Sequence, residues 1–339
     1  MADMFLGRRG LLGATGAMLA APALAQAPVR DITIQLWGTT WTGSLRQVGQ
    51  RFEQATGIKV NAVTQATSGE GLVRLQSMRA APTIDVWFTT SSVAERAKTD
   101  SQLFLPLPMA SLPSAAAIEP GARASHWIGV YFYQLGIVWR PDLVREPITS
   151  WQDLWQPRFA QKLGVPTMNS YQGRVLITAA MLNGGSISNV DPGFEALKRL
   201  KPNVVTWYSS DTTARQALAQ GELSVLVAPP AALKRLSDAG VPGRMISPPP
   251  SPMMYDALML VNTPKKEAAA KFIDFCLTKE MQDFIAQGQG MGPVHPQAST
   301  LPEIAAVLPR PQDRVSFDDD VINANIAAWN ERFNREVTN

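Results

Sequence analysis

The sequence predicts an α/β protein with two domains. Short apolar runs alternate with amphipathic helical patterns in two series, one between residues 32 and 99 and the other between residues 163 and 246. Strands and helices that alternate at this spacing are typical of parallel βαβ units with right-handed crossovers. The chain has 339 residues, which is too long for one ordinary hydrophobic core, so two domains are expected.

The first series begins with a predicted strand at 32–36 and a loop over Trp37–Gly43. Ser44 is placed as a helix cap, and Gly57 as a typical helix end. The remaining elements are predicted as a strand at 58–63, a helix at 71–80, a strand at 84–88 and a helix that opens at Ser91 or Ser92 and reaches about residue 99.

The middle of the chain carries one or two predicted strands within Trp127–Trp139 and a short capped helix at Ser150–Trp155. The second series follows as strands at 163–165, 204–208, 223–227 and 244–246, with helices at 171–182, 191–200, 213–220 and 231–239. A final helix is predicted over 320–336.

A late stretch, residues 253–296, has the pattern of a strand followed by two helices and a Gly-Pro turn. Ala257–Val261 is an apolar run too short for a helix, so it is interpreted as a buried strand. Thr263 and Pro264 then mark a helix start. Periodicity alone leaves open whether this strand extends the second sheet or returns to the first domain.

The composition limits the classes of function. Hydrophobic residues make up 45% and charged residues 17%, as in globular proteins. The net charge is +3 with scattered Lys and Arg, so nucleic-acid binding has no support. Cys276 is the one cysteine, which rules out an intrachain disulfide, and its place on an apolar helix face predicts a core residue.

The first 25 residues have the pattern of an export signal. Arg8-Arg9 precede Leu11-Leu12 and a short apolar stretch, which ends in the small-x-small cleavage pattern Ala23-Leu24-Ala25. The arginine pair and the weakly hydrophobic middle predict the twin-arginine route and a periplasmic mature protein. The alternative is an uncleaved anchor, but the apolar run is short of a full membrane span.

An ordered set of motifs resembles the periplasmic solute-binding proteins of ABC importers, especially the spermidine/putrescine-binding type. The motifs are Phe52–Val60 (FEQATGIKV), Asp85–Phe88 (DVWF), Gly136–Trp139 (GIVW), Ser150–Leu154 (SWQDL), Gln220–Leu223 (QGEL) and residues 253–296 with the closing Gly292-Pro293-Val294. Each motif alone is weak, whereas the set covers nearly the whole chain after residue 25 in the family's order.

The resemblance implies a type II periplasmic-binding-protein fold, with two α/β lobes joined by hinge strands and a ligand held between them by hinge closure. Lobe one is then expected at 26–137 with 258–300, lobe two at 138–257, and a C-terminal helical segment at 301–339 packing on the lobes. The strand after Asp256 is expected to cross back to lobe one. The implied partners are a small-molecule ligand and a membrane permease complex, with no cofactor and a monomeric binding protein.

In open α/β sheets ligands bind beyond the carboxyl ends of the strands, where helix N-termini present N–H groups. The loops at these positions are rich in hydroxyl and amide side chains, which suits a small polar ligand. Ser and Thr at these positions also cap helices and turns, so either role is open for each. The candidate ligand-binding residues are Trp37, Thr39, Thr40, Trp41, Ser68, Gly69, Glu70, Thr89, Thr90, Ser91, Asn169, Ser170, Tyr171, Gln172, Gly173, Arg174, Ser209, Ser210, Asp211, Tyr255 and Asp256.

Three kinds of contact are considered for the ligand. Trp37 and Trp41 form either an aromatic floor of the pocket or part of the core. Asp256 matches the position at which polyamine binders pair an Asp with a ligand ammonium. Arg174, near a helix start, either pairs with a ligand acid or is a solvated helix residue. An amine at Asp256 and an acid near Ser170 would describe a zwitterion.

The chain departs from the polyamine binders at Met168 and Asn169, where they carry acidic residues, and near Ala228-Pro229, where they carry a pocket Trp. Iron binders of the superfamily use adjacent tyrosines, whereas Trp207-Tyr208 offers one. No metal site is expected, because only two His occur and Asp318–Asp320 lacks the spacing of a calcium loop. That run is interpreted as the solvated start of the last helix.

The leading hypothesis is a non-enzymatic, exported binding component of an ABC importer, with Glu53 and Glu95 as possible docking charges. An exported enzyme is the alternative from another class. The sequence argues against an enzyme, because it contains no G-x-S-x-G, H-E-x-x-H or C-x-x-C motif and no glycine-rich phosphate loop. A ligand-sensing partner of a chemoreceptor would use the same fold and stays open.

Overall fold

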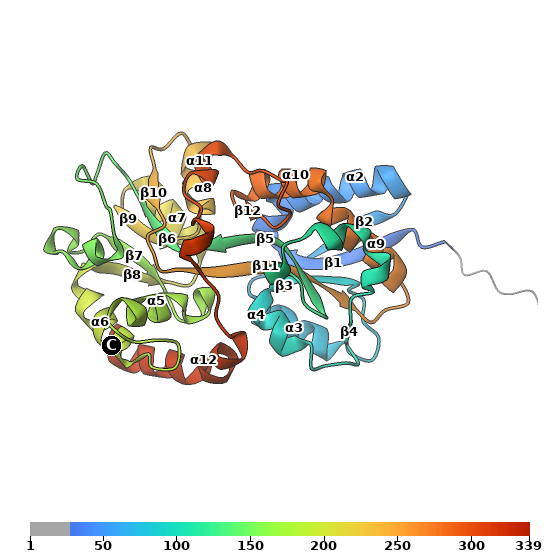
Figure 1. Cartoon of the computed structure of the whole chain (residues 1–339), viewed down its shortest axis with the longest axis horizontal. Helices are drawn as coiled ribbons and strands as arrows, with labels where there is room; N and C mark the ends of the chain where they lie inside the picture. The colour runs from blue at the N-terminus through green and yellow to red at the C-terminus, as the bar shows by residue number, and fades with distance from the viewer. Residues whose placement is uncertain (1–27) are drawn as a thin grey trace, which may run out of the picture.

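The computed structural model describes residues 28–339, apart from the side chain of Pro311. The predicted export signal, residues 1–25, lies outside this range. In the described part of the chain, no helix has the length and apolar character needed to cross a membrane. The described residues form two lobes, each built on its own sheet with helices on both faces (Figure 1).

The sheet of lobe one has the strand order β12-β5-β11-β3-β1-β2, with two short strands, β4 and β13, paired to β11. β1, β2 and β3 are parallel, whereas β11 runs antiparallel to both β3 and β5. The strands are β1 (Asp31–Trp37), β2 (Lys59–Gln65), β3 (Val86–Thr90), β4 (Phe104–Leu105), β5 (Trp127–Gln134), β11 (Ser251–Val261), β12 (Gly292–Pro293) and β13 (Arg314–Val315).

The sheet of lobe two has the order β10-β6-β9-β7-β8, with a parallel core of β7, β8 and β9 and antiparallel β6 and β10. Its strands are β6 (Gly136–Trp139), β7 (Leu163–Pro166), β8 (Val204–Tyr208), β9 (Val225–Ala228) and β10 (Arg244–Ile246). These bounds match the predicted second series closely, because Pro, Gly and the helix caps punctuate that part of the chain clearly.

The α-helices after α1 lie at or near the predicted positions. They are α1 (Gly38–Thr40), α2 (Arg46–Thr56), α3 (Ser68–Ser77), α4 (Ser91–Ala97), α5 (Arg174–Leu182), α6 (Asp191–Leu200), α7 (Asp211–Gln220), α8 (Ala231–Asp238), α9 (Lys266–Leu277), α10 (Lys279–Gln289), α11 (Pro302–Ala305) and α12 (Asp319–Phe333). Gly57 and Gly221 end α2 and α7 in the left-handed conformation that glycine adopts without strain.

The predicted loop at Trp37–Gly43 is wrong. α1 starts directly after Trp37 and runs through a π-helical turn at Trp41–Leu45 into α2. Ser44 therefore does not cap the helix but lies inside it, buried. Trp37 takes the N-cap position with extended backbone angles and makes no side-chain cap. The helix of this first crossover thus begins directly at the carboxyl end of β1.

The β5–β6 and β10–β11 connections both cross between the lobes. β5 ends at Gln134 in the first sheet and β6 begins at Gly136 in the second, with only Leu135 between them. β11 belongs to the first sheet over its whole length, since Met253 already pairs with Gln134. The predicted boundary at 257/258 therefore places residues 251–257 in the wrong lobe, because pairing with β5 begins before the apolar run at Ala257–Val261.

The core of lobe one is divided by its sheet. Phe88, Leu258 and Tyr131 face the helices that include α2 and α9, whereas Trp87 and Met259 face the side of α3 and α4. Cys276 is fully buried on the α9 face, as the helical pattern predicts, and burial raises the pKa of its thiol far above the ordinary value.

The C-terminal segment contacts both lobes. α12 packs on lobe two, where the Phe333 ring meets Trp207 edge-on at 5.1 Å and Arg332 pairs with Asp191. Near its beginning, the Asn323 amide donates a hydrogen bond of 2.8 Å to the Ser92 carbonyl in α4 of lobe one. α12 therefore lies across the junction of the lobes, at the lower edge of the view in Figure 1.

Candidate functional site

The two lobes meet at a cluster of tyrosine and aspartate side chains, here called the Asp256 cluster. Tyr131, Tyr133 and Asp256 come from the connecting strands β5 and β11, and Tyr171 and Asp211 come from lobe two. Asp256 pairs with Thr90 at the carboxyl end of β3, and Tyr171 and Asp211 follow β7 and β8, so the cluster lies where open α/β sheets bind ligands.

Asp256 is the central acid of this cluster. Its carboxylate is buried and accepts hydrogen bonds from the hydroxyls of Tyr131 at 2.7 Å and Tyr133 at 3.1 Å. Burial raises the pKa of Asp256 to about 7, the negative charge of Asp211 adds to the increase, and the two tyrosine hydrogen bonds oppose it. Near neutral pH the carboxyl group therefore holds or releases a proton with small changes in its surroundings.

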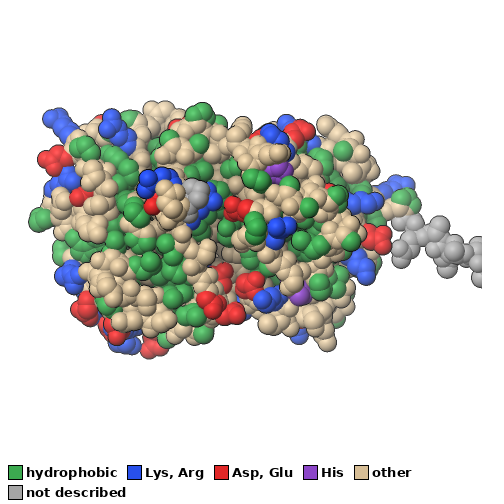
Figure 2. All heavy atoms as spheres, in the orientation of Figure 1, with side chains coloured by type: hydrophobic (Ala, Val, Ile, Leu, Met, Phe, Trp, Pro, Cys, Tyr) green, Lys and Arg blue, Asp and Glu red, His purple; other side chains and the backbone are tan. Residues whose placement is uncertain are grey.

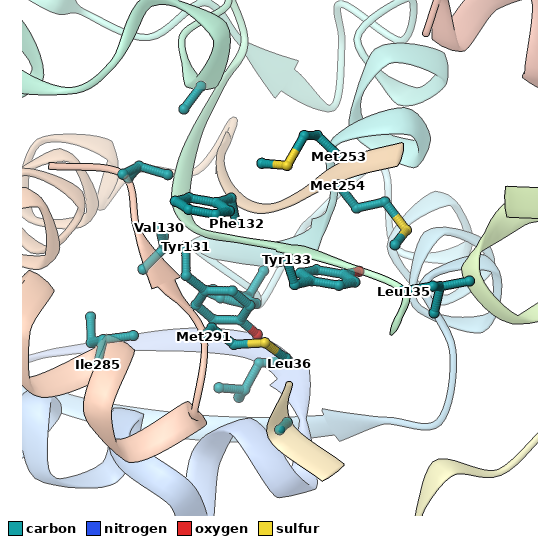
Figure 3. Close-up of a cluster of buried hydrophobic side chains, with 14 of the residues drawn as sticks. Leu36, Val130, Tyr131, Phe132, Tyr133, Leu135, Met253, Met254, Ile285 and Met291 are labelled. Carbon is teal, nitrogen blue, oxygen red and sulfur yellow. The ribbon is translucent and has the colours of Figure 1, made fainter. Parts of the chain in front are cut away.

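Strand register brings the two tyrosines to Asp256. In the antiparallel pair of β11 and β5, Asp256 stands opposite Tyr131 and Met254 stands opposite Tyr133, so these four side chains share one face of the sheet. Figure 3 shows both tyrosines on the same strand, with Phe132 between them in the chain. Burial and the nearby Asp256 raise the pKa of both tyrosines well above the ordinary value, so both act as hydrogen-bond donors.

The lobe-two side is formed by the turn that precedes α5. Tyr171, Gln172 and Gly173 all have positive φ, at 56°, 50° and 71°, which turns the Tyr171 side chain toward the hinge. The Tyr171 hydroxyl donates a hydrogen bond of 2.5 Å to Asp211, and its ring lies edge-on to Tyr133 at 6.2 Å between centroids. The carboxylates of Asp256 and Asp211 thus lie on opposite lobes, with a tyrosine pair between them.

One direct hydrogen bond joins the lobes beside this cluster. The Gln172 amide of lobe two donates to the Thr90 hydroxyl of lobe one at 2.7 Å. Thr90 stands opposite Asp256 in the sheet register, so this contact closes the entrance next to the acid. The two lobes are therefore in direct contact beside the Asp256 cluster.

Arg174 is buried, so its interpretation as a solvated helix residue is wrong. Its guanidinium pairs with Asp319 of α12 at 2.9 Å and lies 5.8 Å from the centre of the Phe317 ring. Asp319 is also not simply solvated, and burial raises the pKa of its carboxyl group while Arg174 opposes this. The pair neutralises Arg174 within the protein.

Several other predicted residues have structural contacts of their own. Glu70 accepts a hydrogen bond from the Ala66 N–H and pairs with Arg74, and Ser210 caps α7 by accepting from the Thr213 N–H. The Ser170 hydroxyl contacts the Tyr208 carbonyl at 3.3 Å, and Ser68 lies 3.5 Å from the Thr90 N–H. These side chains help to shape the loops.

The remaining predicted residues divide by exposure and packing. Trp37 and Trp41 are partly buried against the lobe-one core, and the Trp37 ring meets Phe88 edge-on at 5.9 Å. Thr89 is fully buried, and its hydroxyl has no hydrogen-bond partner among residues 28–339. Thr40 is buried and Ser91 begins α4, while Thr39, Gly69, Asn169 and Ser209 are exposed.

Tyr255 does not join Asp256, because adjacent residues of a strand point to opposite faces. Its side chain instead lines a cavity of about 280 Å³ on the α4 side of β11, together with Ser91, Glu95, Trp127, Arg174 and residues 316–320. Glu95 is not a free outward charge either, since it accepts a hydrogen bond of 2.6 Å from the Trp127 indole and pairs with Lys98.

Sequence reasoning missed Tyr131 and Tyr133. Their signal was present in the strand Trp127–Gln134 (WIGVYFYQ), where two tyrosines alternate with Phe132 and so point to the same side. Only the pairing of β5 with β11 places that side against Asp256.

Residues 47–308, more than half of the chain, match the bacterial extracellular solute-binding proteins. The chain belongs to this family. It is therefore an extracellular solute-binding protein. The predicted family and the two-lobe fold are confirmed.

Several named proteins are similar to this chain. A gamma-aminobutyric acid-binding protein from Pseudomonas aeruginosa is 25% identical over 295 residues, which are 82% of this chain and 80% of that protein. A spermidine/putrescine-binding periplasmic protein from Haemophilus influenzae is 31% identical over 143 residues, 40% and 38% of the two chains. The solved structure of a GABA receptor superposes with a TM-score of 0.77 at 22% identity, covering 90% of this chain and 96% of its own.

Proposed function

We propose that this protein binds a small amine-bearing solute, an ω-amino acid or a polyamine, between its lobes at the Asp256 cluster. Hinge closure around β5 and β11 holds the solute, and the loaded protein delivers it to a membrane permease. The protein acts in the periplasm as a monomer without catalysis, after export directed by residues 1–25. Two of the similar proteins are named for GABA and for spermidine and putrescine, which supports an amine as the recognised group.

The observation that carries the proposal is the buried carboxylate of Asp256 with its two tyrosine donors. A carboxylate that is costly to bury alone gains a partner when an ammonium group binds next to it. Asp211 on the opposite lobe adds a second negative charge and accepts from Tyr171. A cation between the lobes would satisfy both carboxylates at once, which favours an amine over an acid as the primary anchor.

The acid half of a zwitterion has less support than the amine half. Arg174, its predicted partner, is already paired with Asp319 and buried. An acid group would instead meet the exposed hydroxyl side chains at Ser209 and Ser210. The choice between an amino acid and a polyamine therefore depends on a ligand comparison.

The experiment is calorimetric titration of the purified protein with γ-aminobutyrate, putrescine, spermidine and butyrate. Butyrate is the matched control, since it keeps the chain and the acid but lacks the amine. We expect at least one amine to bind and butyrate not to bind. Asp256→Asn should weaken amine binding by about 10- to 100-fold, the value of a charge-assisted hydrogen bond of roughly 1.5–3 kcal/mol.

Asp283→Asn serves as the matched substitution, because Asp283 pairs with Lys279 on the surface of α10, away from the Asp256 cluster. Equal affinity of the wild type and the Asp256→Asn variant would refute the amine anchor. Turnover of any titrated compound would refute the non-enzymatic role. The chemoreceptor alternative predicts the same binding. Deletion of a neighbouring permease gene separates the two roles, because loss of growth on the bound amine would indicate import and unchanged growth would indicate sensing.

A further inference from the structure

The helix α10 makes a very close contact with the π-helical turn Trp41–Leu45 that follows α1. A Cβ atom on Gly288 of α10 would lie 2.9 Å from the Gly43 carbonyl oxygen, and a Cβ atom on Gly43 would lie 2.8 Å from Gln289 Nε2. At Gly288 the obstacle is backbone, which cannot move aside as a flexible side chain can. The backbones of the helix and the turn are therefore in direct contact.

Gln289 is the side chain that joins these two elements. Its amide donates hydrogen bonds to the Thr40 carbonyl at 3.0 Å and to the Ser44 hydroxyl at 2.7 Å. The two acceptors lie at the beginning and near the end of the widened turn, so one amide holds the turn from outside. Short π-helical turns within α-helices occur frequently at functional sites.

This contact is uncharged and buried. The face of the molecule in Figure 2 mixes Lys and Arg with Asp and Glu. In contrast, Thr40, Ser44 and Gln289 are only 4%, 0% and 6% exposed. A buried carbonyl or hydroxyl that loses its partner cannot pair with water instead, so its loss destabilises the arrangement. The Gln289 amide therefore fixes the position of the turn.

The turn places Thr40 at the Asp256 cluster. Burial and the charge of Asp256 raise the pKa of Tyr131, and a hydrogen bond with the Thr40 side chain opposes this increase. The Tyr131 hydroxyl donates to Asp256 at 2.7 Å. A chain of contacts therefore runs from α10 through Thr40 and Tyr131 to Asp256.

The segment after α10 contacts the same tyrosine. Met291, directly before β12, belongs to the buried cluster that contains Tyr131 (Figure 3). In β12, Pro293 pairs with Tyr131, and a Cβ atom on Gly292 would lie 2.3 Å from the Phe132 ring. The end of α10 is thus fixed against the strand that carries the tyrosine as well as against the turn.

We propose that Gln289 is a positioning residue for the solute site, because it holds Thr40 in the place that keeps the Tyr131 hydroxyl directed at Asp256. Its effect on affinity rests on the proposed function, whereas its effect on Asp256 also applies to the empty protein. Without the Gln289 amide, the turn shifts and the hydrogen bond from Tyr131 weakens. A carboxylate that loses a donor binds its proton more tightly.

The size of the effect follows from the pKa of Asp256, which is about 7. The titratable groups that act on it are Tyr131 and Tyr133 of β5 and Asp211 of α7, and all three stay in place in the variants below. Loss of one hydrogen bond raises such a pKa by about one unit. The ionised fraction at pH 7 then falls from about one half to about one tenth, so amine binding weakens about fivefold.

The test replaces the amide with a side chain of similar size, Gln289→Met. The first readout is the pKa of Asp256 in the ligand-free protein, from a ¹³C NMR titration of the aspartate carboxyl groups, with the Asp256 signal assigned from Asp256→Asn. We expect this pKa to rise by about one unit. The second readout is calorimetric affinity for γ-aminobutyrate and putrescine, which should fall about fivefold at pH 7 and recover toward pH 9.

Asn203→Leu is the matched control. The Asn203 amide is also buried and donates two hydrogen bonds, at 2.7 and 3.1 Å, but it precedes β8, at the end of the strand away from Asp211. This variant should lose melting temperature without a change in the pKa of Asp256. In a Thr40→Val background, Gln289→Met should raise that pKa less, because Thr40 carries part of its effect.

Ser44→Ala is a second, milder variant in case Gln289→Met does not fold, since it removes one of the two acceptors. It should raise the pKa of Asp256 in the same direction by a smaller amount. An unchanged pKa in the folded variants, or an equal change in Asn203→Leu, would overturn the positioning role. If no amine binds to the wild type, the proposed function fails while the pKa of Asp256 still decides the role of Gln289.

Discussion

At the scale of single residues, the buried carboxylate of Asp256 lowers the stability of the folded protein. Its carboxylate is buried against two tyrosine hydroxyls with no positively charged partner among the described residues. Burial of an uncompensated carboxylate raises its pKa, because the charged form loses hydration. This destabilising carboxylate at the junction of the lobes supports the proposed role of Asp256 in binding.

This cost gives a prediction for Asp256→Asn in the absence of ligand. The pKa of Asp256 is 3.8 in the unfolded reference and about 7 in the folded protein, so only the folded state holds the proton between these values. The free energy of unfolding therefore falls as the pH rises from about 4 to 7 and is level above that. Each pKa unit corresponds to about 1.4 kcal/mol, so the total is a few kcal/mol.

The variant should thus be more stable than the wild type at pH 8, and the difference should shrink toward pH 5. Denaturant unfolding at pH 5, 6, 7 and 8 measures it directly. Asp283→Asn is the control, because the pKa of Asp283 is lowered and the loss of its charge should not stabilise the protein at pH 8. A stability difference for Asp256→Asn that does not change with pH would contradict the raised pKa.

At the scale of elements, the contact between α3 and the sheet of lobe one depends on a buried amide network. The Gln35 amide donates to Gln65 Oε1 at 3.0 Å, and the Trp87 indole donates to the same oxygen at 2.8 Å. Gly71 of α3 lies directly over these amides. A Cβ atom at this position would lie 1.9 Å from Gln65 Oε1 and 2.6 Å from Gln35 Nε2.

Gly71→Ala is therefore expected to destabilise the protein by roughly 1–3 kcal/mol, since the buried amides must move or lose their partners. Gly69→Ala in the same helix is the matched control, because its added Cβ would meet no atom nearer than 3.8 Å. Thermal unfolding of the two variants measures the difference. Equal melting temperatures of the two variants would show that α3 accommodates the added Cβ atom without a loss of stability.

At the scale of the whole molecule, the lobes are linked by the strands β5 and β11, by the contact of Gln172 with Thr90, and by α12. α12 contacts lobe two through Phe333 and Arg332 and contacts α4 of lobe one through Asn323, so it bridges the two lobes. If the proposed hinge closure separates and joins the lobes, the contacts of α12 with one of them must form and break with it.

Asn323→Ala should therefore weaken ligand binding by about 2- to 10-fold, the value of one hydrogen bond of about 0.5–1.5 kcal/mol, with little change in melting temperature. Asn325→Ala is the matched control, because its amide donates to the Val321 carbonyl within α12 itself. Calorimetric affinity and the radius of gyration in solution, with and without ligand, test the difference. Equal ligand affinity of the two variants would contradict a role of α12 in lobe closure.

Local sequence pattern determined a large part of this structure. The alternation of strands and helices, the Gly57 and Gly221 helix ends and the core position of Cys276 follow from periodicity and residue type. The pattern failed at Trp37–Gly43, since a helix that starts without a side-chain cap leaves no local signal. It also misplaced the start of β11, because Ser251–Pro252 resembles a loop while its neighbour strands are distant in the chain.

The sequence by itself determined that this chain is a two-lobe α/β solute-binding protein and that Asp256 is a candidate anchor. Only the tertiary structure decided what surrounds that acid, since its partners Tyr131 and Tyr133 lie 125 and 123 residues away. The pairing of Arg174 with Asp319 spans 145 residues. The physical reason is that local propensity sets elements, whereas strand register and lobe closure set which side chains meet.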